Sequence, residues 1–150
     1  DNMRVVIQRV EKANVLIDYN ERKSIDNGLV VFLGITENDT DDDIKYLVKK
    51  IENIRIFDEN DKMNLSIKDI KGDIMVISQF TLYANTKNGN RPSFEKSLKY
   101  DLAKDIYDKF IDEIKKSDIN IVTGKFGSDM KVSLVNDGPV TIIIDSKGEI

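Results

Sequence analysis

The stretch Asn136-Asp137-Gly138-Pro139-Val140-Thr141 lies between two short apolar runs near the end of the chain, 130–135 and 140–144. Both runs are rich in β-branched residues, which favour strands. Glycine supplies an unusual φ and proline a fixed one, so spacing alone predicts a turn at this point. A strand, a turn and a strand therefore form the expected C-terminal framework of the fold.

A second informative stretch ends another apolar run, 73–82, which predicts a strand. Four side chains that could serve a site follow one another there: Ser78, Gln79, Phe80 and Thr81. If the pleat is regular, Gln79 and Thr81 point to the same side of the sheet. We expect a small polar patch at the end of an apolar wall.

The first third of the chain predicts strands and a helix. Alternating apolar and polar residues indicate strands at 3–10 and 13–18 with a bend between them, and a buried strand is expected at 29–35. Thr40, followed by three aspartates, is typical of a helix N-terminus, and an apolar stripe extends this helix towards Arg55. We interpret the stripe as core and assign the helix no chemistry.

The last third predicts one more helix, from Glu95 or Leu102 to Lys115, with an apolar stripe that we also interpret as core. A short strand at 119–123 then leads into a glycine turn at 124–127. The turn lacks the upstream glycine and the Ser or Thr of a phosphate-binding loop. No internal repeat is present.

Composition describes one globular domain that spans residues 1–150. We expect Asp1 and Asn2 to be a remnant in front of Met3, and leave them out of the interpretation. No apolar run is long enough to cross a bilayer and no signal-peptide pattern opens the chain, so we expect a cytoplasmic protein without a membrane partner.

The chain contains no histidine and no cysteine. This excludes Ser-His-Asp and Cys-His catalysis as well as a Cys/His zinc site. The aspartate-rich turn at 58–62 does not fit a calcium-binding EF-hand, because Met63 stands where that loop needs glycine. We expect no metal and no cofactor.

Lysine and arginine number 23 and aspartate and glutamate number 27, giving a net charge of −4. This balance argues against a protein that coats long nucleic acid, whose affinity would come from many phosphate contacts. A protein that binds only one end of an RNA is still compatible with it.

Taken together, the motifs resemble the D-aminoacyl-tRNA deacylase family, also called D-tyrosyl-tRNA deacylase. The resemblance covers nearly the whole chain, and its blocks occur in the family's order: MRVVIQRV at 3–10, GLVV at 28–31, KMNLS at 62–66, SQFTL at 78–82, Gly89 with RPSF at 91–94, Thr123-Gly124 with Phe126-Gly127, and NDGPVT at 136–141. Each block is weak alone, whereas the ordered set is specific.

The resemblance implies a mixed α/β fold with curved, barrel-like, mainly antiparallel sheets and two packed helices. It further implies a homodimer with its active sites at the subunit interface. The Gly138-Pro139 pair of one subunit, joined by a cis peptide bond, would insert into the site of the other. Its two carbonyls would face the α-carbon of the substrate and exclude L-amino acids sterically.

The implied reaction is hydrolysis of the ester bond between a D-amino acid and the terminal ribose of tRNA, which is chiral proofreading. A glycyl ester, which has no side chain to reject, would also be accepted. Water would attack, helped by backbone amides around Phe80 and Thr81 and by the ribose hydroxyl. A covalent role for Thr81 stays open as an alternative.

The resemblance assigns further roles within the site. Ser78 and Gln79 would line the pocket and hold the ribose or the substrate amine, whereas the Phe80 side chain also fits a packing role. Phe126 and Met130 would contribute to binding the terminal adenine. Arg91 is the candidate for a tRNA phosphate, although a loop arginine is more often merely solvated. The alternative function is a DNA-binding, replication-associated factor.

Overall fold

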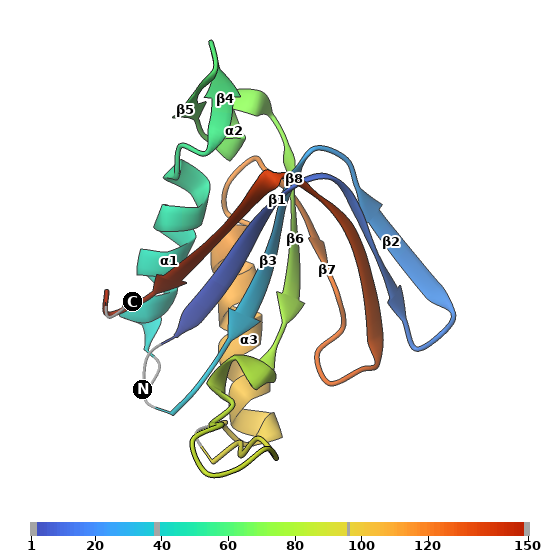
Figure 1. Ribbon diagram of the computed structural model, residues 1–150, viewed down its shortest axis with the longest axis vertical. Helices are drawn as coiled ribbons and strands as arrows, with labels where there is room; N and C mark the ends of the chain where they lie inside the picture. The colour runs from blue at the N-terminus through green and yellow to red at the C-terminus, as the bar shows by residue number, and fades with distance from the viewer. Residues whose placement is uncertain (1–2, 38–39, 96, 149–150) are drawn as a thin grey trace.

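The computed structural model describes residues 3–37, 40–95 and 97–148. The elements follow in the order β1 (Arg4–Ile17), β2 (Glu21–Ile25), β3 (Gly28–Gly34), α1 (Asp41–Asn53), β4 (Phe57–Glu59), β5 (Lys62–Leu65), α2 (Ile67–Ile70), β6 (Asp73–Ser78), the 3₁₀ helix η1 (Phe80–Tyr83), α3 (Tyr100–Ile114), β7 (Asn120–Thr123) and β8 (Met130–Asp145) (Figure 1).

One curved sheet organises the molecule, in the order β2-β1-β3-β6-β7, with β8 paired to β1. The pairs of β1 with β2, β3 and β8 are antiparallel, whereas β3–β6 and β6–β7 are parallel. Figure 1 shows β1 and β8 bending together, so that the outer strands fold round towards β7. The predicted mixed α/β fold with a barrel-like sheet is confirmed.

The two predicted helices are α1 and α3, which lie together on one face of the sheet (Figure 1). Thr40 is the N-cap of α1 as predicted, and its hydroxyl accepts a hydrogen bond from the Asp43 amide. The third helix, α2, has only four residues and was not predicted. Its Ser66 cap is the only sequence signal in so short a segment.

The 136–141 stretch does not form the predicted tight turn between two strands. It lies within the continuous strand β8, and the bend is accommodated by two register shifts against β1, on either side of Val10. The physical reason is tertiary: β1 pairs with β8 on both sides of the bend, at Asn136 and at Thr141, and residues 137–140 bulge out between these pairs. Pairing with a long neighbour therefore overrides the local turn preference of Asp-Gly-Pro.

The core fills the space between the sheet and the helices, with a second, smaller cluster inside the curve of the outer strands. Fully buried side chains of the main cluster include Ile7 of β1, Leu47 of α1, Ile74 of β6 and Phe110 of α3. Burial on this scale is the main stabilising contribution in a chain without disulfides. No helix among the described residues has the length and apolar character that a membrane span requires.

Candidate functional site

Strand β6 leads to the predicted site residues 78–81, but it ends earlier than expected, at Ser78. After Ser78, the Gln79 amide still donates to the Leu33 carbonyl at 2.8 Å, and the chain then turns into η1. The prediction of one strand over 73–82 is therefore wrong. The reason lies in β3, which ends at Gly34.

The missing side chain of Gly34 makes room for η1. A Cβ on Gly34 would meet the Tyr83 ring at 2.9 Å and the Leu82 side chain at 3.1 Å. The Tyr83 hydroxyl also donates to the Gly34 carbonyl at 3.2 Å. The turn thus packs onto the end of β3 instead of extending the sheet.

The expected polar patch forms through this turn. The Gln79 side-chain amide donates a hydrogen bond to the Thr81 hydroxyl. In the part of the chain that the structure describes, the backbone amides of Phe80 and Thr81 donate to no other backbone group, because they open the 3₁₀ helix. Two N–H groups are therefore left beside the patch for a ligand.

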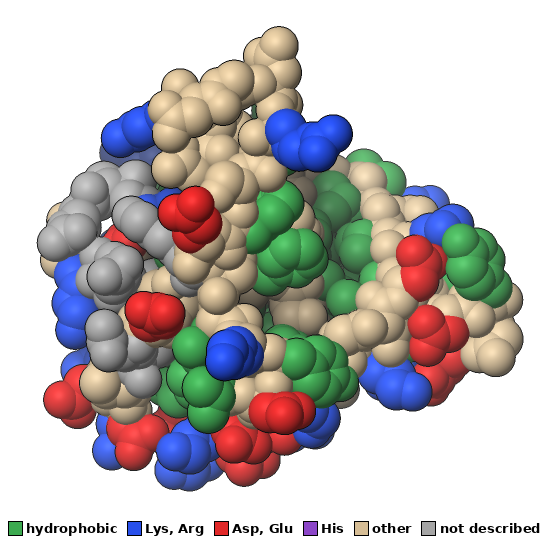
Figure 2. Space-filling view, turned by 90° about the horizontal axis from the view of Figure 1, so that it is seen from below, with side chains coloured by type: hydrophobic (Ala, Val, Ile, Leu, Met, Phe, Trp, Pro, Cys, Tyr) green, Lys and Arg blue, Asp and Glu red, His purple; other side chains and the backbone are tan. Residues whose placement is uncertain are grey.

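A cavity of about 230 Å³ lies next to η1. Its lining is mainly apolar and comes from β3, the end of β6, α3 and the 124–127 turn, with these residues: Leu33, Ile35, Ser78, Gln79, Phe80, Leu98, Tyr100, Ala103, Phe126 and Gly127. Figure 2, which views the molecule from below, shows hydrophobic side chains around a hollow. An apolar pocket with few polar groups is typical of a small-ligand site.

The structure brings Ser78, Gln79, Phe80 and Phe126 together in this lining. The apolar members from α3 and the segment before it were not predicted as site residues, because sequence periodicity cannot distinguish a pocket wall from core. Thr81 is exposed and reaches the cavity only through its bond to Gln79.

Phe126 is held by two tyrosines. Its ring centroid lies 5.3 Å from that of Tyr100 and 5.2 Å from that of Tyr107. Burial, and to a lesser extent the nearby Asp108 carboxylate, raise the pKa of Tyr107 to about 12. The Tyr107 hydroxyl therefore stays protonated at neutral pH and supplies no base to the pocket.

Met130 lies outside this cavity lining. It is half-buried against the second core cluster, and its sulfur lies 2.5 Å from the position of a Cβ on Gly124. Arg91 is exposed in the loop 84–94 that follows η1. Neither of these two predicted residues is among the lining residues of the cavity, which the other four share.

The Gly138-Pro139 pair lies at the opposite end of the sheet, and its peptide bond is cis. Through β1, the segment around Asn136 is level with Gly28 of β3. Ser78 instead pairs with Leu33. Leu33 and Gly28 are separated by about 16 Å along the strand, at roughly 3.3 Å per residue. One chain therefore does not bring the two motifs together.

Polar contacts hold the residues on either side of the exposed 137–139 segment. Asn136 donates from its side-chain amide to the Thr141 hydroxyl at 3.0 Å and accepts from the Val140 amide at 3.1 Å. Gln8 of β1 also donates to the Thr141 hydroxyl, at 3.1 Å. Asp137, Gly138 and Pro139 are exposed beyond these contacts.

Arg9 is the most buried cation of the described residues, and it holds the 137–139 segment through a hydrogen bond from its guanidinium. It is 6% exposed, its Nε donates to the Asp137 carbonyl at 3.0 Å, and its Nη1 donates to the Ile56 carbonyl at 2.7 Å. The guanidinium also forms ion pairs with the carboxylates of Asp58 at 3.3 Å and Asp137 at 3.6 Å. The sequence does not single out Arg9 as a site residue, although an arginine at an inward-facing position of an apolar strand is a usable signal.

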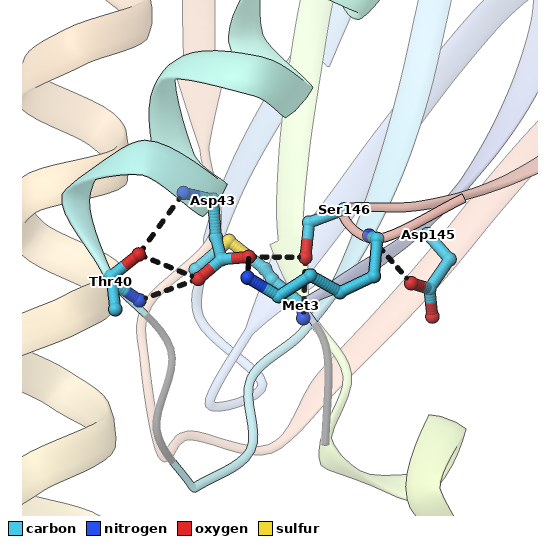
Figure 3. A network of polar contacts seen from close by, with 6 residues as sticks. Met3, Thr40, Asp43, Asp145 and Ser146 are labelled. Atoms are coloured by element: carbon cyan, nitrogen blue, oxygen red, sulfur yellow. Dashed lines mark hydrogen bonds and ion pairs between the residues drawn. The ribbon is translucent and has the colours of Figure 1, made fainter. Parts of the chain in front are cut away.

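A separate polar network joins the start of β1 and the end of β8 to α1 (Figure 3). The Ser146 hydroxyl donates to Asp43 at 2.6 Å and accepts from the Met3 amide at 3.1 Å, while Lys147 pairs with Asp43 at 3.2 Å. Burial alone would raise the pKa of Asp43, but hydrogen bonds from Ser146, Thr40 and Lys147 outweigh it and lower the pKa to about 2. This network is structural.

A larger cavity of about 660 Å³ lies where β6 begins, between α2 and the end of α3. It contains none of the predicted site residues. Among the described residues, no three acidic, cysteine or histidine side chains are grouped so as to hold a metal ion.

Comparison with known proteins gives a family match. A family model described as D-Tyr-tRNA(Tyr) deacylase matches residues 6–145. A D-aminoacyl-tRNA deacylase of Fusobacterium nucleatum subsp. nucleatum is 58% identical over 146 residues, which cover 97% of each chain. One of Finegoldia magna is 53% identical over 148 residues, which cover 98% of this chain and 100% of that protein.

Two solved structures share the fold. One, titled c-Myc DNA Unwinding Element Binding Protein, is 35% identical with a TM-score of 0.86, over 94% of this chain and 97% of that chain. The other, titled as a probable eukaryotic D-amino acid tRNA deacylase, has a TM-score of 0.83 over 97% of this chain and 100% of that chain. Its identity of 19% supports the fold alone.

Proposed function

Because the chain belongs to the D-Tyr-tRNA(Tyr) deacylase family, we propose that it hydrolyses the ester bond between a D-amino acid and the 3′ end of tRNA. The observation that carries the proposal within this chain is the apolar cavity beside η1, with Ser78 and Gln79 in its wall. The cavity would receive the aminoacyl end, with Phe126 available to the terminal adenine. A tRNA substrate supports the cytoplasmic location that we propose.

The chemistry requires donors for the negative charge that develops on the ester carbonyl oxygen. The amides of Phe80 and Thr81 are available for this, since they make no bond to another backbone group among the described residues. We assign the nucleophile to a water molecule, assisted by the terminal ribose hydroxyl. No metal or cofactor enters this scheme.

Thr81 is better suited to positioning than to attack. Its hydroxyl accepts a hydrogen bond from the Gln79 side-chain amide, and an amide nitrogen cannot take a proton from it. The chain has no histidine to act as the base.

Chiral selection would come from a second copy of the chain. In one chain the exposed Gly138-Pro139 pair lies about 16 Å along the sheet from the Ser78 end. An arrangement in which the pair of one subunit reaches the cavity of the other is compatible with that exposure. Its carbonyls would then leave room for hydrogen where an L-amino acid carries its side chain.

The test is time-resolved deacylation of D-Tyr-tRNA and L-Tyr-tRNA by the purified protein. Rapid loss of the D-ester with the L-ester spared is the expected result. Cleavage of both esters would support the esterase activity and would contradict the proposed selection against L-amino acids. If folded protein cleaves neither, the proposed function fails.

DNA binding is not favoured as the function. The net charge of −4 provides little attraction for duplex phosphates, and the relatives above 50% identity are named as deacylases.

A further inference from the structure

Two aromatic rings lie exposed and in contact at the edge of the proposed substrate cavity. Phe80 is 58% exposed and Phe94 is 37% exposed, and their ring centroids are 5.2 Å apart. Phe80 also lines the cavity, whereas Phe94 is not among its lining residues. The pair therefore continues the apolar wall from the cavity onto the outer surface.

The position of Phe94 is fixed by the loop that carries it. Asn85 and Ser93 exchange two backbone hydrogen bonds, of 2.7 and 2.9 Å, which close the loop just before Phe94. The Phe94 carbonyl then accepts from the Ser97 amide at 3.0 Å. The ring is thus presented from a closed backbone loop, although it is not packed into the core.

The same loop is positively charged within an acidic protein. Residues 84–94 include Lys87 and Arg91, both exposed, and no aspartate or glutamate, whereas the whole chain has a net charge of −4. Exposed aromatic rings beside cations are the combination that binds unpaired nucleotides, since bases stack on the rings and the cations attract phosphates.

We propose that Phe94, together with Phe80, forms a stacking subsite for the unpaired nucleotides that precede the terminal adenosine of tRNA, with Arg91 close to their phosphates. The inference rests on the proposed function, because the substrate's terminal adenosine must occupy the neighbouring cavity. The other candidate occupant is a second copy of this chain, but its net charge of −4 is spread over the whole protein, whereas an RNA strand carries a phosphate on every nucleotide and bases that stack on exposed rings.

The experiment compares two substrates that have the same D-tyrosyl ester and differ in the nucleotides that precede the terminal adenosine. One is D-Tyr-tRNA and the other is D-tyrosyl-adenosine, which has no preceding nucleotide. Phe94→Ala is expected to lower kcat/KM on D-Tyr-tRNA by roughly 5- to 100-fold, as loss of one stacked base does, and to leave D-tyrosyl-adenosine unchanged. Phe94→Tyr should retain the activity, whereas Phe94→Leu should lose it.

Tyr46→Ala is the matched control, because Tyr46 is 39% exposed on α1 and lies outside the cavity lining. Equal loss on both substrates would make Phe94 a structural residue and overturn the subsite. Unchanged activity on D-Tyr-tRNA would also overturn the subsite. A change in association state, measured by sedimentation, would overturn it as well and would assign Phe94 to a protein interface. If the unmodified protein cleaves neither substrate, it is the proposed function that has failed.

Discussion

The Nε of Arg9 donates a 3.0 Å hydrogen bond to the carbonyl of Asp137, the residue immediately before the Gly138-Pro139 pair. A cation that is almost fully buried in β1 thereby supports an exposed segment of β8. The same guanidinium also binds the Ile56 carbonyl. Arg9 therefore links the exposed 137–139 segment to Ile56, which lies in the short loop between α1 and β4.

Arg9→Met is expected to lower the free energy of unfolding by about 2 to 4 kcal/mol, because it leaves two carbonyls without their charged donor. It should also lower the preference for D-Tyr-tRNA over L-Tyr-tRNA, since the segment next to Asp137 loses its support. Chemical denaturation and paired deacylation assays measure the two effects. Arg22→Met, at an exposed position of β2, is the control. Equal stability of the two variants would contradict the role of Arg9.

Asp43→Asn is expected to destabilise the protein at neutral pH by about 1 to 2 kcal/mol. The folded-state pKa of Asp43 is about 2, below its ordinary value of 3.8, so ionised Asp43 stabilises the fold above pH 4. That contribution decreases as the pH falls from about 4 to about 2. Unfolding of both proteins across this range should show the difference shrinking. A constant difference would mean that the charge is not responsible.

Thr81→Ala is expected to reduce kcat by less than about tenfold, the effect of losing roughly one hydrogen bond with Gln79. Single-turnover deacylation of D-Tyr-tRNA measures the change. Complete loss of activity in a variant with an unchanged circular dichroism spectrum would restore Thr81 as the nucleophile.

Gly28→Ala is expected to destabilise the fold by about 3 kcal/mol. A Cβ at Gly28 would lie 1.9 Å from the Asp73 carbonyl oxygen, so β3 and β6 would have to separate where their pairing begins. Gly89→Ala is the control, because Gly89 has a positive φ but nothing within 4 Å, and it should cost only about 1 to 2 kcal/mol. Thermal unfolding compares the two, and equal losses would contradict a steric conflict between a Cβ at Gly28 and the Asp73 carbonyl.

Local signals were sufficient where the neighbouring residues themselves determine the structure. The N-cap at Thr40 and the buried strand β3 follow from capping chemistry and from an uninterrupted apolar run. The end of β6 at Ser78 could not be predicted, since it depends on the space that Gly34 provides on another strand. The continuity of β8 through Gly138-Pro139 likewise depends on its partner β1.

The candidate site was predictable only in part for the same reason. Ser78, Gln79 and Phe80 are adjacent in sequence, and the structure adds Phe126 to them. Tyr100 and Leu98 complete the wall, but nothing in an apolar helical pattern distinguishes a residue facing a cavity from one in the core. Met130 is separated from this wall because its side chain belongs to the other core cluster.

The pairing of β1 with β8 along their length has a consequence for synthesis on the ribosome. Arg4 pairs with Asp145, and Ile17 pairs with Met130, so β1 has to wait for β8, which is synthesised long after it. Local helices form quickly, whereas pairs this distant in sequence form slowly. The nascent chain therefore leaves one edge of β1 uncovered until β8 has been synthesised, and during that time the edge depends on protection from aggregation.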